Sequence, residues 1–140
     1  MIRYNSNEAK IPAFPRRKIS NWIKSVAFSL NRKVGEVSYI FCSDQKILEV
    51  NQDFLSHDFY TDVITFDYSS DNIITGDIFI SIDTVQSNAI QYKTTFINEL
   101  YRVIIHGILH LCGMRDKTVK EKELMRKQEN VALSSLINYL

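Results

Sequence analysis

The sequence predicts an α+β fold in which a small mixed β-sheet packs with several helices. Along the longer segments, apolar residues recur every three or four positions, whereas shorter runs are rich in β-branched and aromatic residues. Apolar residues make up 45% of the 140 residues, which is enough for one hydrophobic core. The chain has no internal repeat, low-complexity run or Pro/Gly-rich linker. We therefore expect residues 1–140 to form one domain.

The first predicted helix spans about residues 19–30, where apolar side chains return at helical spacing. Ser20 is available as an early cap, and Gly35 follows as a stop. Before this helix the sequence indicates only a turn, marked by Pro12 and Pro15.

The middle of the chain is expected to supply the sheet and a second helix. Three strands are expected, at residues 37–41, 63–66 and 73–82, the last interrupted at Gly76 and Asp77. The helix lies between the first two strands, over about residues 45–55, with Asp44 as its cap.

Three helices are expected after the last strand. They span about residues 83–92, beginning at Asp83 or Thr84, then about residues 95–112, and finally about residues 119–139. Thr94 or Thr95 caps the second of them, which is strongly apolar, and Gly113 ends it.

The segment His106-Gly-Ile-Leu-His110-Leu-Cys-Gly113-Met-Arg-Asp116 predicts a metal site on this apolar helix and the loop after it. Residues four apart share a helix face, so His106 and His110 can bind one ion. Gly113 lets the chain leave the helix, and Asp116 can return as a third ligand. Three protein ligands plus a water are typical of a catalytic zinc site, so we expect one Zn²⁺ per chain.

Two other kinds of metalloprotein remain as alternatives. Zinc proteases share this spacing, but they carry a glutamate general base directly after the first histidine, where this chain has Gly107. A non-catalytic factor with a structural metal would need a fourth ligand, for which Cys112 or His57 are available.

The histidine segment resembles the signature of the YbeY family of ribosomal-RNA maturation endoribonucleases, approximately HGxLHLxGxxH, at each fixed position through Gly113. Other stretches resemble the family in the same order. In the segment that begins at Asn51, Asp58 and residues 61–66 resemble the family's "KDxPTDVLSF" segment. Gly76-Asp77-Ile78 resembles its "GDI" strand, and the helix containing Met125 and Glu129 resembles its C-terminal helix. The resemblance covers about residues 35–135.

This resemblance implies a zinc-dependent endoribonuclease specific for single strands, acting in 16S rRNA 3′-end maturation and ribosome quality control. It implies single-stranded or ribosomal RNA and the small ribosomal subunit as partners, and it gives no reason to expect DNA. The metal ligands, which are also the catalytic residues, would be His106, His110 and Asp116. No residue stands out as a general base.

The sequence departs from the family at two positions. Asp116 stands where the family usually has a histidine, but a carboxylate is also a good zinc ligand. Leu55 stands where the family usually has an arginine suited to hold a phosphate. His57 could partly replace it. Arg102 is another possible phosphate contact, although a salt bridge to Glu99 or to the last helix is favoured.

Four further acidic or polar residues are candidates for supporting the metal site. Asp62, Thr65 and Asp77 either orient the histidines or are structural, Asp62 by capping a turn. Glu99 lies two helical turns before His106, about 10 Å along the helix, which is too far for it to bind the same ion.

Composition points to a cytoplasmic protein. The net charge is +1, so charge alone does not indicate a nucleic-acid partner. Cys42 and Cys112 are far apart and are expected to be reduced and near the core. Residues 1–18 lack the apolar stretch of a signal peptide, and no segment is long enough to cross a membrane.

Overall fold

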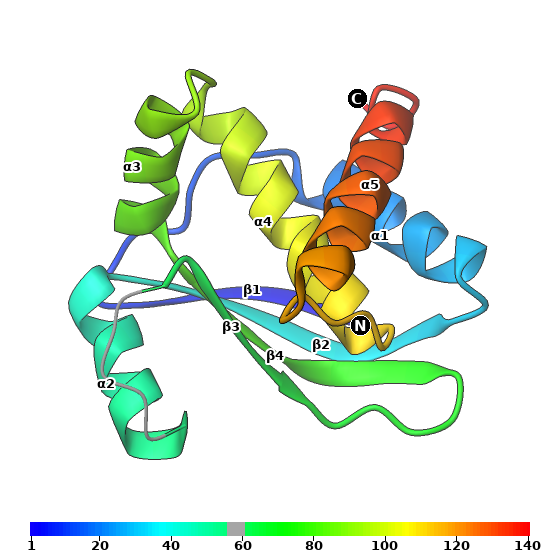
Figure 1. The fold of residues 1–140 in the computed structure, drawn as a ribbon, viewed down its shortest axis with the longest axis horizontal. Coiled ribbons are helices and arrows are strands. Elements are labelled where there is room, and N and C mark those ends of the chain that lie inside the picture. The colour runs from blue at the N-terminus through cyan, green and yellow to red at the C-terminus, as the bar shows by residue number, and fades with distance from the viewer. Residues whose placement is uncertain (56–60) are drawn as a thin grey trace.

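The computed structural model describes residues 1–55 and 61–140, apart from the side chain of Leu55 (Figure 1). It confirms the predicted α+β class. The elements are β1 (Ile2–Asn7), α1 (Arg16–Ser29), β2 (Lys33–Cys42), α2 (Asp44–Leu55), β3 (Val63–Asp67), β4 (Ile73–Ser81), α3 (Ile82–Gln91), α4 (Phe96–Leu111) and α5 (Val119–Leu136). Among the described residues, no helix has both the length and the apolar character needed to cross a bilayer.

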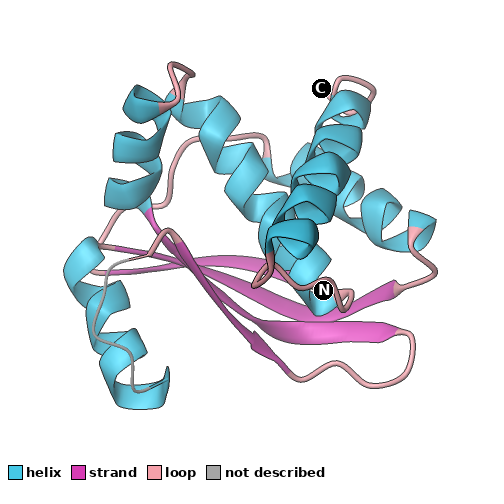
Figure 2. Ribbon diagram, in the orientation of Figure 1, coloured by secondary structure: helices cyan, strands magenta, loops and turns pink. Residues whose placement is uncertain are grey.

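The sheet is mixed, as predicted, with strand order β1-β2-β4-β3. β1 and β4 both run parallel to β2, whereas β3 runs antiparallel to β4. Figure 2 shows α1, α3, α4 and α5 on one side of this sheet and α2 near one end on the other. The main core lies between the four helices and the sheet. A smaller apolar cluster, which includes Ile47, Val50 and Ile64, lies between α2 and the other face of the sheet.

Close packing of α4 on the sheet fixes the position of the histidine segment. A Cβ added at Gly107 would lie 2.9 Å from Cγ2 of Ile78 on β4, so only glycine lets the two backbones approach this closely. The buried hydroxyl of Tyr39 on β2 donates a hydrogen bond of 2.9 Å to the carbonyl oxygen of Ile104 on α4. These contacts hold α4 against the sheet and leave His106 and His110, on the flank of the helix, partly exposed.

The edge strand β1 was not predicted. Only Ile2 and Tyr4 of its six residues are partly buried, and the others are exposed and polar, so no apolar run marks it as a strand. Tyr4 stacks on Tyr39 of β2, with ring centroids 5.5 Å apart. β1 is therefore defined by pairing with β2 rather than by its own composition.

Helix α1 differs from the prediction at both ends. It begins at Arg16 after Pro15, and Ser20 is not its cap, because the Ser20 hydroxyl instead hydrogen-bonds the Tyr4 hydroxyl at 2.8 Å. The helix ends before Gly35, which lies inside β2 at an irregularity in the pairing with β4. The expected interruption of β4 at Gly76 and Asp77 is also absent.

Among the later helices, the cap predicted at Asp44 is wrong and the cap predicted at Thr95 is confirmed. The Ser43 hydroxyl, not Asp44, accepts from a backbone N–H at the start of α2. The Asp44 carboxylate accepts instead from the hydroxyls of Ser81 and Thr84, both at 2.5 Å. Helix α3 begins at Ile82, one or two residues before the predicted start, and is capped by Ser81. Thr95 caps α4, as predicted.

Candidate metal centre

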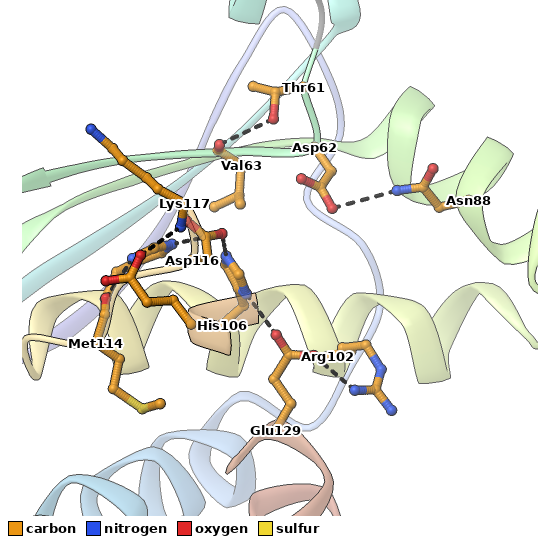
Figure 3. Close-up of polar contacts among 12 residues, drawn as sticks. Thr61, Asp62, Val63, Asn88, Arg102, His106, Met114, Asp116, Lys117 and Glu129 are labelled. Carbon is orange, nitrogen blue, oxygen red and sulfur yellow. Dashed lines mark hydrogen bonds and ion pairs between the residues drawn. The ribbon is translucent and has the colours of Figure 1, made fainter. Parts of the chain in front are cut away.

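The structure brings the three predicted ligands, His106, His110 and Asp116, to one place (Figure 3). The two histidines lie one turn apart on α4, and Asp116 comes from the segment between α4 and α5. Oδ2 of Asp116 lies 3.3 Å from Nε2 of His106 and 3.4 Å from Nε2 of His110. One ligand atom from each residue lies within 4.8 Å of the other two.

A glycine turn at the end of α4 returns the chain to the histidines. Gly113 has a φ of +97°, which favours glycine. Its N–H donates to the carbonyl of His110 at 2.9 Å, and the N–H of Met114 donates to the carbonyl of Leu109 at 3.0 Å. This pair of bonds is a Schellman motif. Asp116 follows within three residues, so the motif places it beside the helix face it has just left.

The second ring nitrogen of each histidine is held by an acceptor. Nδ1 of His110 donates to the carbonyl oxygen of Met114 at 2.9 Å, and Nδ1 of His106 lies 2.6 Å from Oε2 of Glu129 on α5. A carbonyl or an ionised carboxylate can only accept, so Nδ1 carries the hydrogen. In both neutral rings the lone pair is therefore on Nε2, the nitrogen that lies near Asp116.

Glu129 is buried and is held from two sides. Arg102 donates to its Oε1 at 2.8 Å and also to Oδ1 of Asn130 at 2.9 Å. Burial raises the pKa of Glu129, but the hydrogen bonds from His106 and Arg102 outweigh burial and hold it below its usual value. Glu129 is therefore ionised near neutral pH. Arg102 forms the expected salt bridge to the last helix.

The two histidines differ electrostatically. Burial lowers the pKa of His106, but the hydrogen bond and charge of Glu129 outweigh it, so the pKa is raised overall. The pKa of His110 is lowered, chiefly by burial and then by the neighbouring charge of His106. Metals bind neutral imidazole, so His110 is ready to bind at lower pH than His106.

The donor set fits zinc. Donor atoms bound to zinc at about 2.0–2.1 Å in a tetrahedron lie about 3.3–3.4 Å from one another. Both distances to the Asp116 oxygen match this edge. Within residues 1–55 and 61–140 no other group of three His, Cys, Asp or Glu side chains meets in this way. Cys112 is not in the group. Its thiol is buried, and burial raises its pKa to about 11.

The other supporting residues predicted from the sequence do not hold the histidines. Asp62 accepts a hydrogen bond of 3.4 Å from Asn88 on α3, and Figure 3 shows it across from His106, on the side away from Glu129. Burial raises the pKa of Asp62. Asp77 lies on the opposite face of the sheet from Ile78, which packs on α4. Thr65 has no hydrogen bond to a histidine among the described residues.

Two residues that orient the histidines, Glu129 and Met114, were missed as such from the sequence. Met114 acts through its backbone, for which its side chain gives no signal, and Glu129 is 23 residues from His106 on another helix. The predictions for the Leu55 side chain, His57 and Asp58 lie outside the described residues. Arg115 and Lys117, which flank Asp116, are exposed, and both cysteines are buried and free.

Comparisons with known proteins point to one family. A family model described as Endoribonuclease YbeY matches residues 1–137. A protein of Parabacteroides distasonis named Endoribonuclease YbeY is 53% identical over 135 residues, covering 96% of this chain and 95% of its own. A protein of the same name from Phocaeicola vulgatus is 54% identical over 134 residues, covering 96% and 97%. The solution structure of a Thermotoga maritima protein is 27% identical, with a TM-score of 0.68, and covers 97% of this chain and 89% of its own.

Proposed function

Because this chain belongs to the YbeY family of endoribonucleases, we propose that it is a zinc-dependent endoribonuclease that cuts single-stranded RNA at the site of His106, His110 and Asp116. The observation that carries the proposal is the geometry of the donor atoms. Two Nε2 atoms lie 3.3 and 3.4 Å from one carboxylate oxygen, while both Nδ1 atoms are occupied.

The chain's own residues prepare this site. Glu129 and the Met114 carbonyl hold the two imidazole rings with Nε2 toward the centre, and the Schellman motif brings in Asp116. Zinc bound there would polarise a phosphodiester and lower the pKa of a water molecule. The nucleophile is either that water or the 2′-hydroxyl of the RNA.

The proposal also includes the cellular role of the enzyme, which the names of the relatives do not state. We place the activity in 16S rRNA 3′-end maturation and ribosome quality control, in the cytoplasm, with the small ribosomal subunit as partner. Residues 1–140 would act as one domain, since the family match spans residues 1–137.

The protease alternative lacks its general base. Gly107 stands where zinc proteases carry a glutamate. An added Cβ there would lie 2.9 Å from Ile78, so this position faces the sheet rather than the centre. A peptide-cleavage screen beside the RNA assay would separate the two substrate classes.

The test is to measure the metal content of the wild type and of His110→Ala by elemental analysis, with cleavage of single-stranded RNA assayed on the same samples. We expect near-stoichiometric zinc in the wild type, and loss of both zinc and cleavage in the variant. Lys24→Ala, which changes an exposed residue of α1, is the matched control and should retain both. Wild type without metal, or cleavage that survives loss of zinc, would overturn the proposal. Stoichiometric zinc without cleavage would indicate the non-catalytic factor.

A further inference from the structure

A polar cavity lies along α4 from the metal centre. Its volume is about 340 Å³, and it opens between the N-terminal half of α4, the end of α3 and α5. Cavities that hold small ligands have volumes of about 300–1,000 Å³. The residues lining it that bear on its chemistry are Tyr92, Asn98, Glu99, Arg102 and Arg126.

Glu99 is an unusual residue in this cavity. It is 6% exposed, yet its carboxylate has no hydrogen bond or ion pair to any residue the structure describes. Neither of its oxygens is completely enclosed by protein, because no fully buried side-chain oxygen lacks a partner among these residues. Burial and the nearby charge of Asp62 raise the pKa of Glu99, and the charges of Arg102 and Arg126 offset this only in part, so the ionised carboxylate is costly to hold here. A ligand that donated N–H groups to Glu99 would relieve that cost.

The position of Glu99 relates the cavity to the metal centre. Glu99 precedes His106 by seven residues, so the two lie on the same face of α4, about 10 Å apart along the helix axis. Arg102 lies one turn from each of them. A single strand of RNA with a phosphate at the metal could therefore place the base of a flanking nucleotide in the cavity.

The surrounding groups suit a nucleobase. Tyr92 is 55% exposed and offers a ring on which a base can stack. Arg126 is exposed, with no hydrogen bond or ion pair to the described part of the chain, and it can reach a phosphate. Asn98 is exposed beside Glu99 and can donate an amide N–H.

Hydrogen-bond chemistry selects among the four bases. Guanine presents N1–H and the N2 amino group side by side, so the two oxygens of one carboxylate can accept from both. Adenine and cytosine present one amino group next to a ring acceptor, which would repel the second oxygen. Uracil presents one N–H between two carbonyls. Guanine also carries an acceptor, O6, beside N1–H, and the Asn98 amide lines the same cavity and can donate an N–H.

We propose that this cavity binds an unpaired guanine base of the RNA substrate, flanking the cleaved phosphate, with Glu99 accepting from its N1–H and N2–H. The proposal rests on the proposed ribonuclease function. Glu99 is then a specificity-determining residue, and cleavage depends on the base in this cavity.

The test compares guanosine with inosine, which lacks only the N2 amino group. Zinc-loaded protein is given single-stranded oligonucleotides with one guanosine or one inosine at each position flanking the cut. We expect guanosine to be favoured about tenfold or more at one position, since a hydrogen bond to a charged group is lost with inosine. In Glu99→Gln this preference should disappear while zinc content is retained. Glu123→Gln, which changes an exposed glutamate of α5, should keep the preference.

A binding measurement separates this proposal from the ribonuclease function. Guanosine and inosine 5′-monophosphates are titrated into the zinc-loaded chain and followed by NMR. Tighter binding of the guanosine nucleotide, lost in Glu99→Gln, supports the cavity assignment even if no RNA is cut, an outcome that would overturn only the ribonuclease function. The assignment would be overturned if guanosine and inosine gave equal cleavage and equal binding affinity. It would also be overturned if a preference for guanosine survived in Glu99→Gln.

Discussion

The two histidines of the candidate metal centre share a helix face but are held by different parts of the molecule. His110 is held by the Met114 carbonyl, four residues later, within the turn that Gly113 allows. His106 is held by Glu129, on α5, which in turn is held by Arg102. One histidine is therefore fixed by local backbone geometry and the other by the packing of two helices.

This difference has consequences for charge as well as geometry. The acceptor for His110 is a neutral carbonyl, and the pKa of His110 is lowered by burial. The acceptor for His106 is a buried carboxylate, and the pKa of His106 is raised overall. A carboxylate partner also makes an imidazole a stronger metal ligand. Each histidine should thus respond to a different set of substitutions.

The largest effect is expected from Glu129→Gln, which removes the charge that holds His106 but retains the side-chain shape. Loss of such a partner typically lowers metal affinity about 10–100-fold. We expect that loss for zinc, measured by competition with a chelator of known affinity. Glu123→Gln on the exposed face of α5 is the matched control. Unchanged affinity in Glu129→Gln would show that the helix packing, rather than the carboxylate, holds His106.

A smaller effect is expected at the local support of His110. Gly113→Ala places a Cβ at a φ of +97°, where the nearest neighbouring atom among the described residues, Nη2 of Arg32, is 3.8 Å away. The cost is therefore backbone strain rather than a clash, about 1–2 kcal/mol of unfolding free energy. Chemical denaturation of the metal-free protein would measure it. Asparagine tolerates positive φ better than alanine, so Gly113→Asn should lose less; an equal loss would contradict the strain explanation.

The same contrast explains what the sequence could predict of the site. His106, His110, Gly113 and Asp116 lie within eleven residues, and helix geometry plus one glycine turn relates them without knowledge of the rest of the fold. The supporting role of Glu129 depends on how α5 packs against α4, which no local pattern records. Residues fixed by local geometry were predictable, and those fixed by packing were not.

The fold shows the same division. The long apolar helices and the mixed sheet follow from periodicity, whereas β1 is defined by Tyr4 stacking on Tyr39 of a neighbouring strand. The position of Asp44 before an apolar helix face predicts a cap. Its carboxylate instead binds Ser81 and Thr84 at the start of α3, because a distant helix offers it two hydroxyl donors.

The smallest expected effect is the pH dependence of stability in the metal-free protein, which compares the two histidines directly. The pKa of Glu129 lies below its usual 4.5, so its contribution is complete above about pH 4.5 and is lost as pH falls through the folded-state value. The pKa of His106 lies above its usual 6.5, so its contribution is complete below about pH 6.5 and is lost as pH rises through the folded-state value. The pair thus stabilises the fold most at about pH 4.5–6.5.

His110 acts in the opposite direction, because its lowered pKa makes the folded protein less stable as pH falls below about 6.5. The difference in unfolding free energy between wild type and Glu129→Gln cancels the part of the His110 contribution that burial causes, which is the larger part, since both proteins retain His110. We expect that difference, measured with a chelator present, to be largest near pH 6 and to shrink toward pH 8.5. A difference that is constant across this range would mean that Glu129 stabilises the fold through Arg102 alone and that His106 is neutral at every pH tested.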